Sequence, residues 1–186
     1  IVSPPYDIDG DPGSFNPTEI ERIQKAWQMV AEDYAPFNVN VTTEDPGDAA
    51  IVRSSPSDDV FGTRVVITRD NFDNCGCGGF AYVGVFDSVG SNTKPAFVFN
   101  TSLVGAGEAI THEVGHNLGL WHDGVEGGDA YYRGQGSGDT GWAPIMGVGY
   151  YKKLVQWSKG EYANANQLQD DVAVIQSNGA LLVPDD

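Results

Sequence analysis

The stretch that decides the fold reads His-Glu-Val-Gly-His-Asn-Leu-Gly-Leu-Trp-His, residues 112–122, and holds all three histidines of the chain. On a helix, residues four apart project from nearly the same face, so His112 and His116 can offer imidazole nitrogens to one metal ion. Gly119 accepts the left-handed backbone conformation that ends a helix, and the turn lets His122 approach as a third ligand. The spacing therefore predicts a zinc site with one tetrahedral position left open.

Glu113 follows the first histidine, beside the place where a water molecule on the metal would lie. Zinc lowers the pKa of such a water to about 7, and a neighbouring carboxylate can accept its proton. The pattern predicts hydrolysis by an activated water, with Glu113 as the general base.

Composition limits the partners of this chain of 186 residues. It has 26 acidic and 10 basic residues, a net charge of −16. Nucleic acids and anionic membranes attract basic surfaces, so we expect neither as a partner. The 40% of hydrophobic residues is enough for a packed core. We expect one monomeric domain over residues 1–186.

The order of predicted elements indicates an α+β fold. Asn16-Pro17-Thr18-Glu19 has the capping residues of a helix start, and apolar residues at helical spacing follow it as far as Tyr34. Further helices are predicted over 105–118 and 166–177, with a glycine-rich loop over 123–142. Strands are predicted at 38–43, 50–53, 64–68, 80–86 and 96–100.

The histidine motif resembles that of the metzincin zinc endopeptidases. Their second mark is a methionine in a tight turn beneath the metal, which Ala143-Pro144-Ile145-Met146-Gly147 resembles, with Met146 as the methionine. Asp123, directly after the third histidine, is similar to the reprolysin (adamalysin) branch, since astacins carry Glu there. The resemblance implies a five-stranded mixed sheet with the active-site helix in an upper subdomain, about 1–119. A small C-terminal subdomain, about 120–186, would follow.

The same resemblance implies a secreted zinc endopeptidase that acts on proteins or peptides. Because the chain begins at Ile1 without a methionine, we expect a signal and a zymogen pro-segment outside it. Two features depart from the family pattern: the chain has no cysteine after Cys77, and Val148 occupies the position where astacins and serralysins place a tyrosine that reaches the metal. Tyr150 and Tyr151 are expected to contact substrate instead.

Residues 79–86 are expected to form the edge strand of the sheet. The family resemblance implies that an extended peptide pairs with this edge, at Ala81, Tyr82, Val83 and Gly84. The alternative is an ordinary sheet edge. Just before it, Cys75 and Cys77 are compatible with a disulfide around a glycine, with free thiols or with partial metal binding.

Asp7-Ile8-Asp9-Gly10-Asp11 is similar to the start of a calcium loop, although no glutamate follows at the twelfth position. We expect either a calcium site on Asp7, Asp9 and Asp11 or a solvated turn. Two alternatives to the endopeptidase also stay open: a zinc hydrolase of non-peptide amides, and a non-catalytic protein-binding domain stabilised by zinc.

Overall fold

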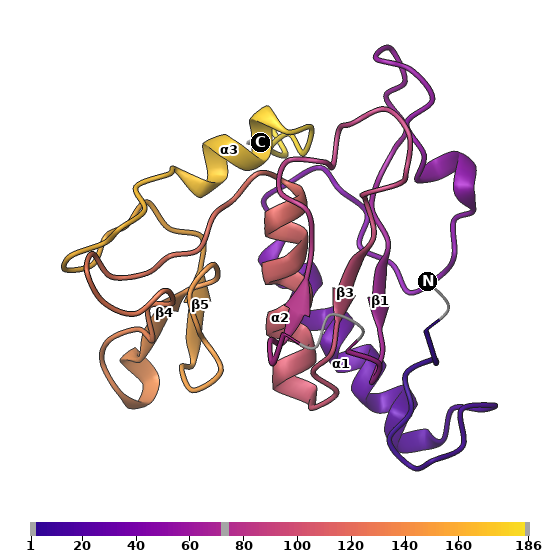
Figure 1. The fold of residues 1–186 in the computed structure, drawn as a ribbon, viewed down its shortest axis with the longest axis horizontal. Helices are drawn as coiled ribbons and strands as arrows, with labels where there is room; N and C mark the ends of the chain where they lie inside the picture. Colours follow the sequence, from indigo (N-terminus) through magenta and orange to yellow (C-terminus); the bar gives the residue numbers. More distant parts are fainter. Residues whose placement is uncertain (1–2, 72–74, 185–186) are drawn as a thin grey trace.

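A computed structural model describes residues 3–71 and 75–184, and over these residues the chain has an α+β fold (Figure 1). The helices are α1 (Pro17–Asp33), α2 (Leu103–Asn117) and α3 (Asp171–Ser177), with short 3₁₀ turns at Asp48–Ala50 and Gly138–Thr140. The strands are β1 (Val65–Ile67), β2 (Gly79–Phe80), β3 (Ala96–Val98), β4 (Trp142–Pro144) and β5 (Leu154–Gln156). The predicted α+β class is confirmed.

The strands form two small sheets in place of the five-stranded sheet that the family resemblance implied. Within the described residues, β1, β3 and β2 form a mixed sheet in that order, with β1 parallel and β2 antiparallel to β3. The other sheet pairs β4 with β5 in parallel. In Figure 1 these two sheets lie on opposite sides of α2. The division into subdomains near residue 119 stays a prediction.

The strands predicted at 38–43 and 50–53 are wrong. The backbone N–H of Asn38 donates to the carbonyl of Leu181 near the C-terminus, and the Trp27 indole donates to the carbonyl of Val41. Gly47, with φ +79°, precedes a 3₁₀ turn over Asp48–Ala50 that reaches the first residue of the second segment, and Arg53 at its end makes only an isolated bridge to Gly90. Both segments use their polar backbone groups outside a sheet, which a pattern of apolar residues does not reveal.

The strand predicted over 80–86 is wrong beyond Phe80. Gly84 turns the chain at φ +68°, and its N–H donates to the carbonyl of His116 at the end of α2. The N–H groups of Val85 and Phe86 donate to the carbonyl of Asn117. The last carbonyls of a helix have no partner within the helix, and this segment supplies donors to them in place of pairing as a strand.

The start of α1 is the predicted capping box. The Asn16 side chain accepts hydrogen bonds from the N–H groups of Thr18 and Glu19, and Glu19 Oε2 accepts the N–H of Asn16 at 2.8 Å. The other Glu19 oxygen accepts the N–H of Ile8 at 2.8 Å. Because Glu19 is fully buried, it also fixes the N-terminal segment against the helix.

The active-site helix α2 packs against α1. Gly107 lies against Met29, where a Cβ would come within 2.8 Å of the thioether. Thr111 joins the helices twice: its carbonyl accepts the Tyr34 hydroxyl at 3.1 Å, and its hydroxyl donates to Asp33 at 2.7 Å. The core around this contact collects Val30, Tyr34, Phe37, Val98, Ile110, Leu118, Leu120, Ile145, Met146 and Ile175. These contacts hold α2 against α1 and the core.

The C-terminal part differs from its prediction in helix length. The helix predicted at 166–177 begins only at Asp171, with Asp170 as the N-cap whose side chain accepts the N–H of Ala173. Residues 123–142 form the predicted loop apart from the 3₁₀ turn and the first residue of β4. None of the helices in residues 3–71 and 75–184 has both the length and the apolar character needed to cross a membrane.

Replacement of Glu19 by alanine should lower the free energy of unfolding by about 1–3 kcal/mol, because the N–H groups of Ile8 and Asn16 lose a buried acceptor. Urea denaturation at neutral pH measures this change. Glu21→Ala, on the exposed face of the same helix, is the control and should have a smaller effect. Equal stability of the two variants would contradict the buried role of Glu19.

Candidate metal centre and active site

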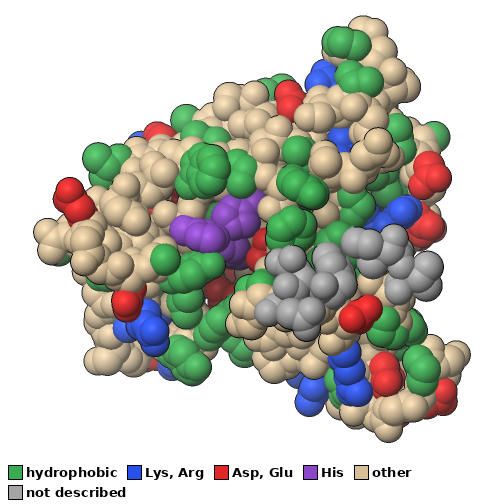
Figure 2. All heavy atoms as spheres, viewed as in Figure 1, with side chains coloured by type: hydrophobic (Ala, Val, Ile, Leu, Met, Phe, Trp, Pro, Cys, Tyr) green, Lys and Arg blue, Asp and Glu red, His purple; other side chains and the backbone are tan. Residues whose placement is uncertain are grey.

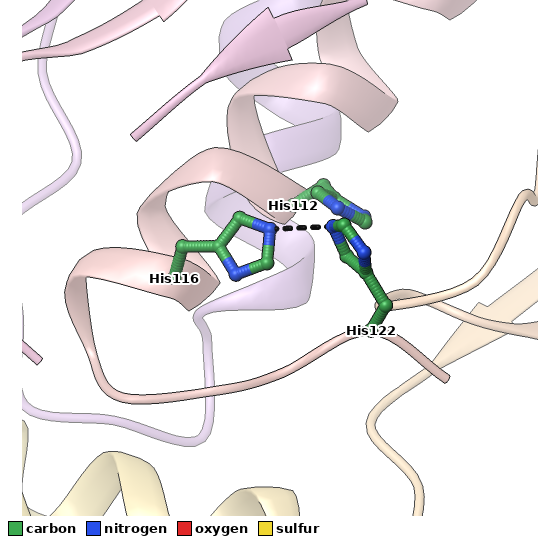
Figure 3. A group of neighbouring side chains, drawn as sticks. All are labelled: His112, His116 and His122. Carbon is green, nitrogen blue, oxygen red and sulfur yellow. Dashed lines mark hydrogen bonds between the residues drawn. The ribbon is translucent and has the colours of Figure 1, made fainter. Parts of the chain in front are cut away.

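The three histidines converge as their spacing predicts (Figure 3). His112 and His116 project from α2, and His122 comes from the segment that follows. Between them Gly119 adopts φ +98°, and its N–H donates to the carbonyl of His116 at 2.8 Å. A side chain there would be strained and would also meet Asn178. The glycine turn therefore returns His122 to the first two histidines.

The ring nitrogens have the arrangement that a metal requires. Each histidine offers one nitrogen within 4.8 Å of the others, and the Nε2 atoms of His116 and His122 lie 2.9 Å apart. Nδ1 of His112 lies 3.0 Å from the carbonyl oxygen of Ile145, and Nδ1 of His116 lies 2.7 Å from that of Leu120. Since a carbonyl only accepts, Nδ1 carries the proton in both rings and Nε2 is left with a lone pair.

These residues fit a zinc ion. Two nitrogens on one tetrahedral zinc are about 3.3 Å apart, and the Nε2 atoms of His116 and His122 lie 2.9 Å apart. Burial lowers the pKa of His112 to about 3 and that of His122 to about 4, so both rings are neutral at physiological pH. Neutral imidazole is the form that binds metal. The group could therefore hold zinc without first losing protons.

Glu113 lies beside this group and is almost fully buried. Burial among the protein's own groups raises its pKa to about 8, and a divalent cation nearby would lower it. The edge strand makes room for the carboxylate at Gly79, where a Cβ would come within 2.6 Å of Glu113. The side chain is therefore confined between α2 and β2.

Met146 lies in a tight turn against the histidine helix. The turn is closed by the N–H of Gly147 donating to the carbonyl of Pro144 at 3.0 Å. Met146 is fully buried beside Gly115, where a Cβ would lie 2.7 Å from its sulfur. The same turn supplies the Ile145 carbonyl that orients His112. It thus contacts α2 both by packing and by hydrogen bonding.

Asp123 anchors the residue after the third histidine. Its carboxylate accepts hydrogen bonds from the hydroxyls of Ser158 at 3.2 Å and Tyr162 at 3.3 Å, and its N–H donates to the carbonyl of Met146. Asp171 lies beyond, where it accepts the N–H of Ser158 at 2.8 Å. These buried hydrogen bonds fix the chain segment that carries His122.

A cavity of about 390 Å³ opens over the three histidines. Figure 2 shows the histidines at a hollow in this face, with hydrophobic side chains around them. Among the predicted substrate contacts, Ala81 and Tyr150 line the cavity, but Tyr82, Val83, Gly84 and Tyr151 do not. The backbone of Tyr82 is already engaged, because its carbonyl accepts the Asn117 amide.

Cys75 and Cys77 form a disulfide at the rim of this cavity. The structure thereby chooses among the three states that the sequence left open. The bridge joins residues on either side of one glycine, just before the edge strand β2. It closes the chain into a small ring next to the active-site hollow.

Two residues near the histidines were missed by sequence reasoning. Tyr131 lines the cavity, with its ring centroid 4.3 Å from that of His122. Glu108, one turn before His112, is partly buried next to Gly149, and burial raises its pKa to about 7. Glycine-rich loop residues have no fixed spacing to the motif, so the only signal for Tyr131 is an aromatic residue within that loop.

The N-terminal acidic residues do not gather as predicted. Asp7, Asp9 and Glu19 each bring an oxygen within 4.8 Å of the others, and Asp11 is not part of this group. Asp7 Oδ1 already accepts the N–H groups of Asp9 and Gly10, and the Arg69 guanidinium lies 3.8 Å from Oδ2. These oxygens serve the backbone and a cation of the protein, and the calcium hypothesis gains no support.

The site combines two histidines on one helix, a third after a glycine turn and a buried carboxylate beside them, a group that could bind zinc. A family model described as metallo-peptidase family M12B, reprolysin-like, matches residues 21–123, more than half of the chain. The chain belongs to this family, which confirms the resemblance read from the motif. The match ends at Asp123, so the Met146 turn lies outside it. No curated protein shows significant similarity to the chain.

Lowering the pH from 7 toward 4 should raise the free energy of unfolding, because the folded protein binds a proton at Asp171. Burial raises its native pKa to about 7, whereas an aspartate in an unfolded chain titrates near 3.9. Between about pH 4 and 7 the folded protein therefore holds a proton that the unfolded chain lacks, and the free energy of unfolding falls as pH rises. The slope contributed is at most about 1.4 kcal/mol per pH unit. Asp171→Asn should make the measured slope shallower.

Urea denaturation at several pH values and constant zinc concentration tests this. Asp170→Asn is the matched control, since the hydrogen bond from Lys159 lowers the pKa of Asp170 and its titration falls below this interval. The control should keep the helix cap, because an asparagine oxygen can still accept the N–H of Ala173, and it should keep the wild-type slope. An unchanged slope in Asp171→Asn would show that Asp171 does not carry the proton.

Proposed function

We propose that this chain is a secreted zinc endopeptidase that hydrolyses peptide bonds with Glu113 as general base and then general acid. One observation carries the proposal: each of the three histidines brings a ring nitrogen within 4.8 Å of the others, beside a buried carboxylate in an open cavity. Membership of the M12B family supports peptides as the substrate class.

The histidines His112, His116 and His122 would hold the zinc, which when bound supplies Lewis acidity toward a water molecule and a carbonyl oxygen. Glu113 accepts a proton from the attacking water as its oxygen bonds to the carbonyl carbon. As the carbon–nitrogen bond breaks, Glu113 returns this proton to the leaving amine. The burial of Glu113 keeps bulk water away from the proton during the transfer.

The edge of the three-stranded sheet supports an extended peptide as the substrate. Gly79 and Phe80 form the outer strand, directly beside Glu113, and Ala81 continues the cavity wall. A peptide adding to this edge would align its backbone through hydrogen bonds. The pairing would be limited to residues 79–81, because backbone groups of residues 82 and 84–86 are bonded to the end of α2.

The disulfide between Cys75 and Cys77 supports secretion. Disulfides persist in oxidising compartments and are rare in the reducing cytosol. This chemistry agrees with the extracellular location that the resemblance implied.

Glu113→Gln should lower kcat by about 100- to 10,000-fold, since the amide cannot accept the proton of the attacking water. Zinc content, measured by metal analysis, should stay at the wild-type level because the histidines are unchanged. Glu126→Gln, an exposed loop residue, is the control and should keep full activity. Substantial peptide cleavage by the zinc-loaded Glu113→Gln protein would sink the mechanism.

A strong chelator should abolish cleavage of casein, and added zinc should restore it. Mapping the cleaved bonds defines a peptide substrate for kinetics, and a simple aryl amide serves as the non-peptide probe. Hydrolysis of the aryl amide without casein cleavage would favour a hydrolase of non-peptide amides. Zinc-loaded protein that cleaves neither would favour a non-catalytic binding domain, and full activity without metal would refute the zinc mechanism.

A further inference from the structure

Tyr131 returns to the histidines from the loop that follows them. Its ring centroid lies 4.3 Å from that of His122 and 6.1 Å from that of His112. It lines the same cavity as Glu113. Tyr131 therefore contributes one wall of the cavity over the metal group.

The loop holds this position through the next residue. The N–H of Tyr132 donates to the carbonyl of Asp123 at 2.6 Å, and the carbonyl of Tyr132 accepts the N–H of Val148 at 2.9 Å. The Tyr132 ring stacks on Tyr162 with centroids 4.0 Å apart and an interplanar angle of 5°. Tyr132 thus faces the C-terminal segment, which leaves its neighbour Tyr131 directed to the site.

The hydroxyl of Tyr131 is available to a substrate. It makes no hydrogen bond within residues 3–71 and 75–184. An unused hydrogen-bond donor therefore belongs to a residue that lines the same cavity as Glu113.

We propose that Tyr131 is a further catalytic residue, whose phenol donates a hydrogen bond to the oxyanion that develops on the substrate carbonyl. This inference rests on the proposed peptidase function. Negative charge grows on the carbonyl oxygen as the water attacks, and a fixed donor at that point lowers the barrier. The phenol proton stays on its oxygen throughout, so Glu113 alone moves the protons of the reaction.

Tyr131→Phe tests the hydroxyl and keeps the ring that packs on His122. Removing one such donor should lower kcat by about 100- to 1,000-fold. KM should change little, because the ground-state carbonyl carries less charge than the oxyanion. Zinc content should stay at the wild-type level. Tyr132→Phe is the matched control, since its ring stacks outside the cavity, and it should keep the wild-type kcat.

A binding measurement separates this inference from the proposed function. A phosphinic peptide carries a tetrahedral anionic group like the oxyanion, and calorimetry measures its affinity without turnover. The zinc-loaded Tyr131→Phe protein should bind it about 100-fold more weakly than the wild type. If the wild type cleaves no peptide, the proposed function fails, but this comparison still decides the role of the phenol.

Wild-type kcat and wild-type phosphinate affinity in Tyr131→Phe would overturn the proposal. A rise in KM alone would also overturn it, because the hydroxyl would then contact substrate without acting on the reaction. If Tyr131→Ala is impaired while Tyr131→Phe is not, the ring only packs against His122. Thermal melting of each variant verifies that the fold is intact.

Discussion

Two backbone carbonyls, of Ile145 and Leu120, accept hydrogen bonds from Nδ1 of His112 and His116, and the site depends on them. A neutral imidazole has one nitrogen with a lone pair, so the position of its proton decides which nitrogen can bind a metal. One carbonyl belongs to the turn of Met146 and the other follows the glycine turn. Backbone outside α2 thus fixes which nitrogen of His112 and of His116 is free to bind a metal.

The site also requires that the backbone of α2 and of the edge strand β2 come very close to neighbouring side chains. Gly115 admits the sulfur of Met146 against α2, and Gly79 admits Glu113 against the edge strand. A methyl group at either position would come within 2.7 Å of its neighbour. Two glycines therefore set how near the turn and the sheet edge stand to the histidine helix, and hence the width of the cavity.

Local spacing allowed the histidine group, the carboxylate beside it and the start of α1 to be predicted. Those features depend on residues within one helix or one turn. The segments 38–43 and 80–86 were misread as strands because their N–H groups bond to Leu181 and to the end of α2, partners far away in sequence. Tyr131 was missed for the same reason, since its place depends on the contacts of Tyr132 with Asp123 and Tyr162.

The contacts between the N-terminal and C-terminal parts of the chain limit the order in which the fold can form. The Trp157 indole donates to the carbonyl of Asp33 across 124 residues, and Asn38 and Val183 bond to Leu181 and Pro36 on the opposite segments. Closing such long loops is slow compared with forming a helix. During synthesis α1 and α2 emerge before their C-terminal partners exist. The contacts of residues 157–183 with residues 33–38 can therefore form only after the histidine motif has been synthesised, and a nascent chain carries that motif before its C-terminal segment can pack beside α1.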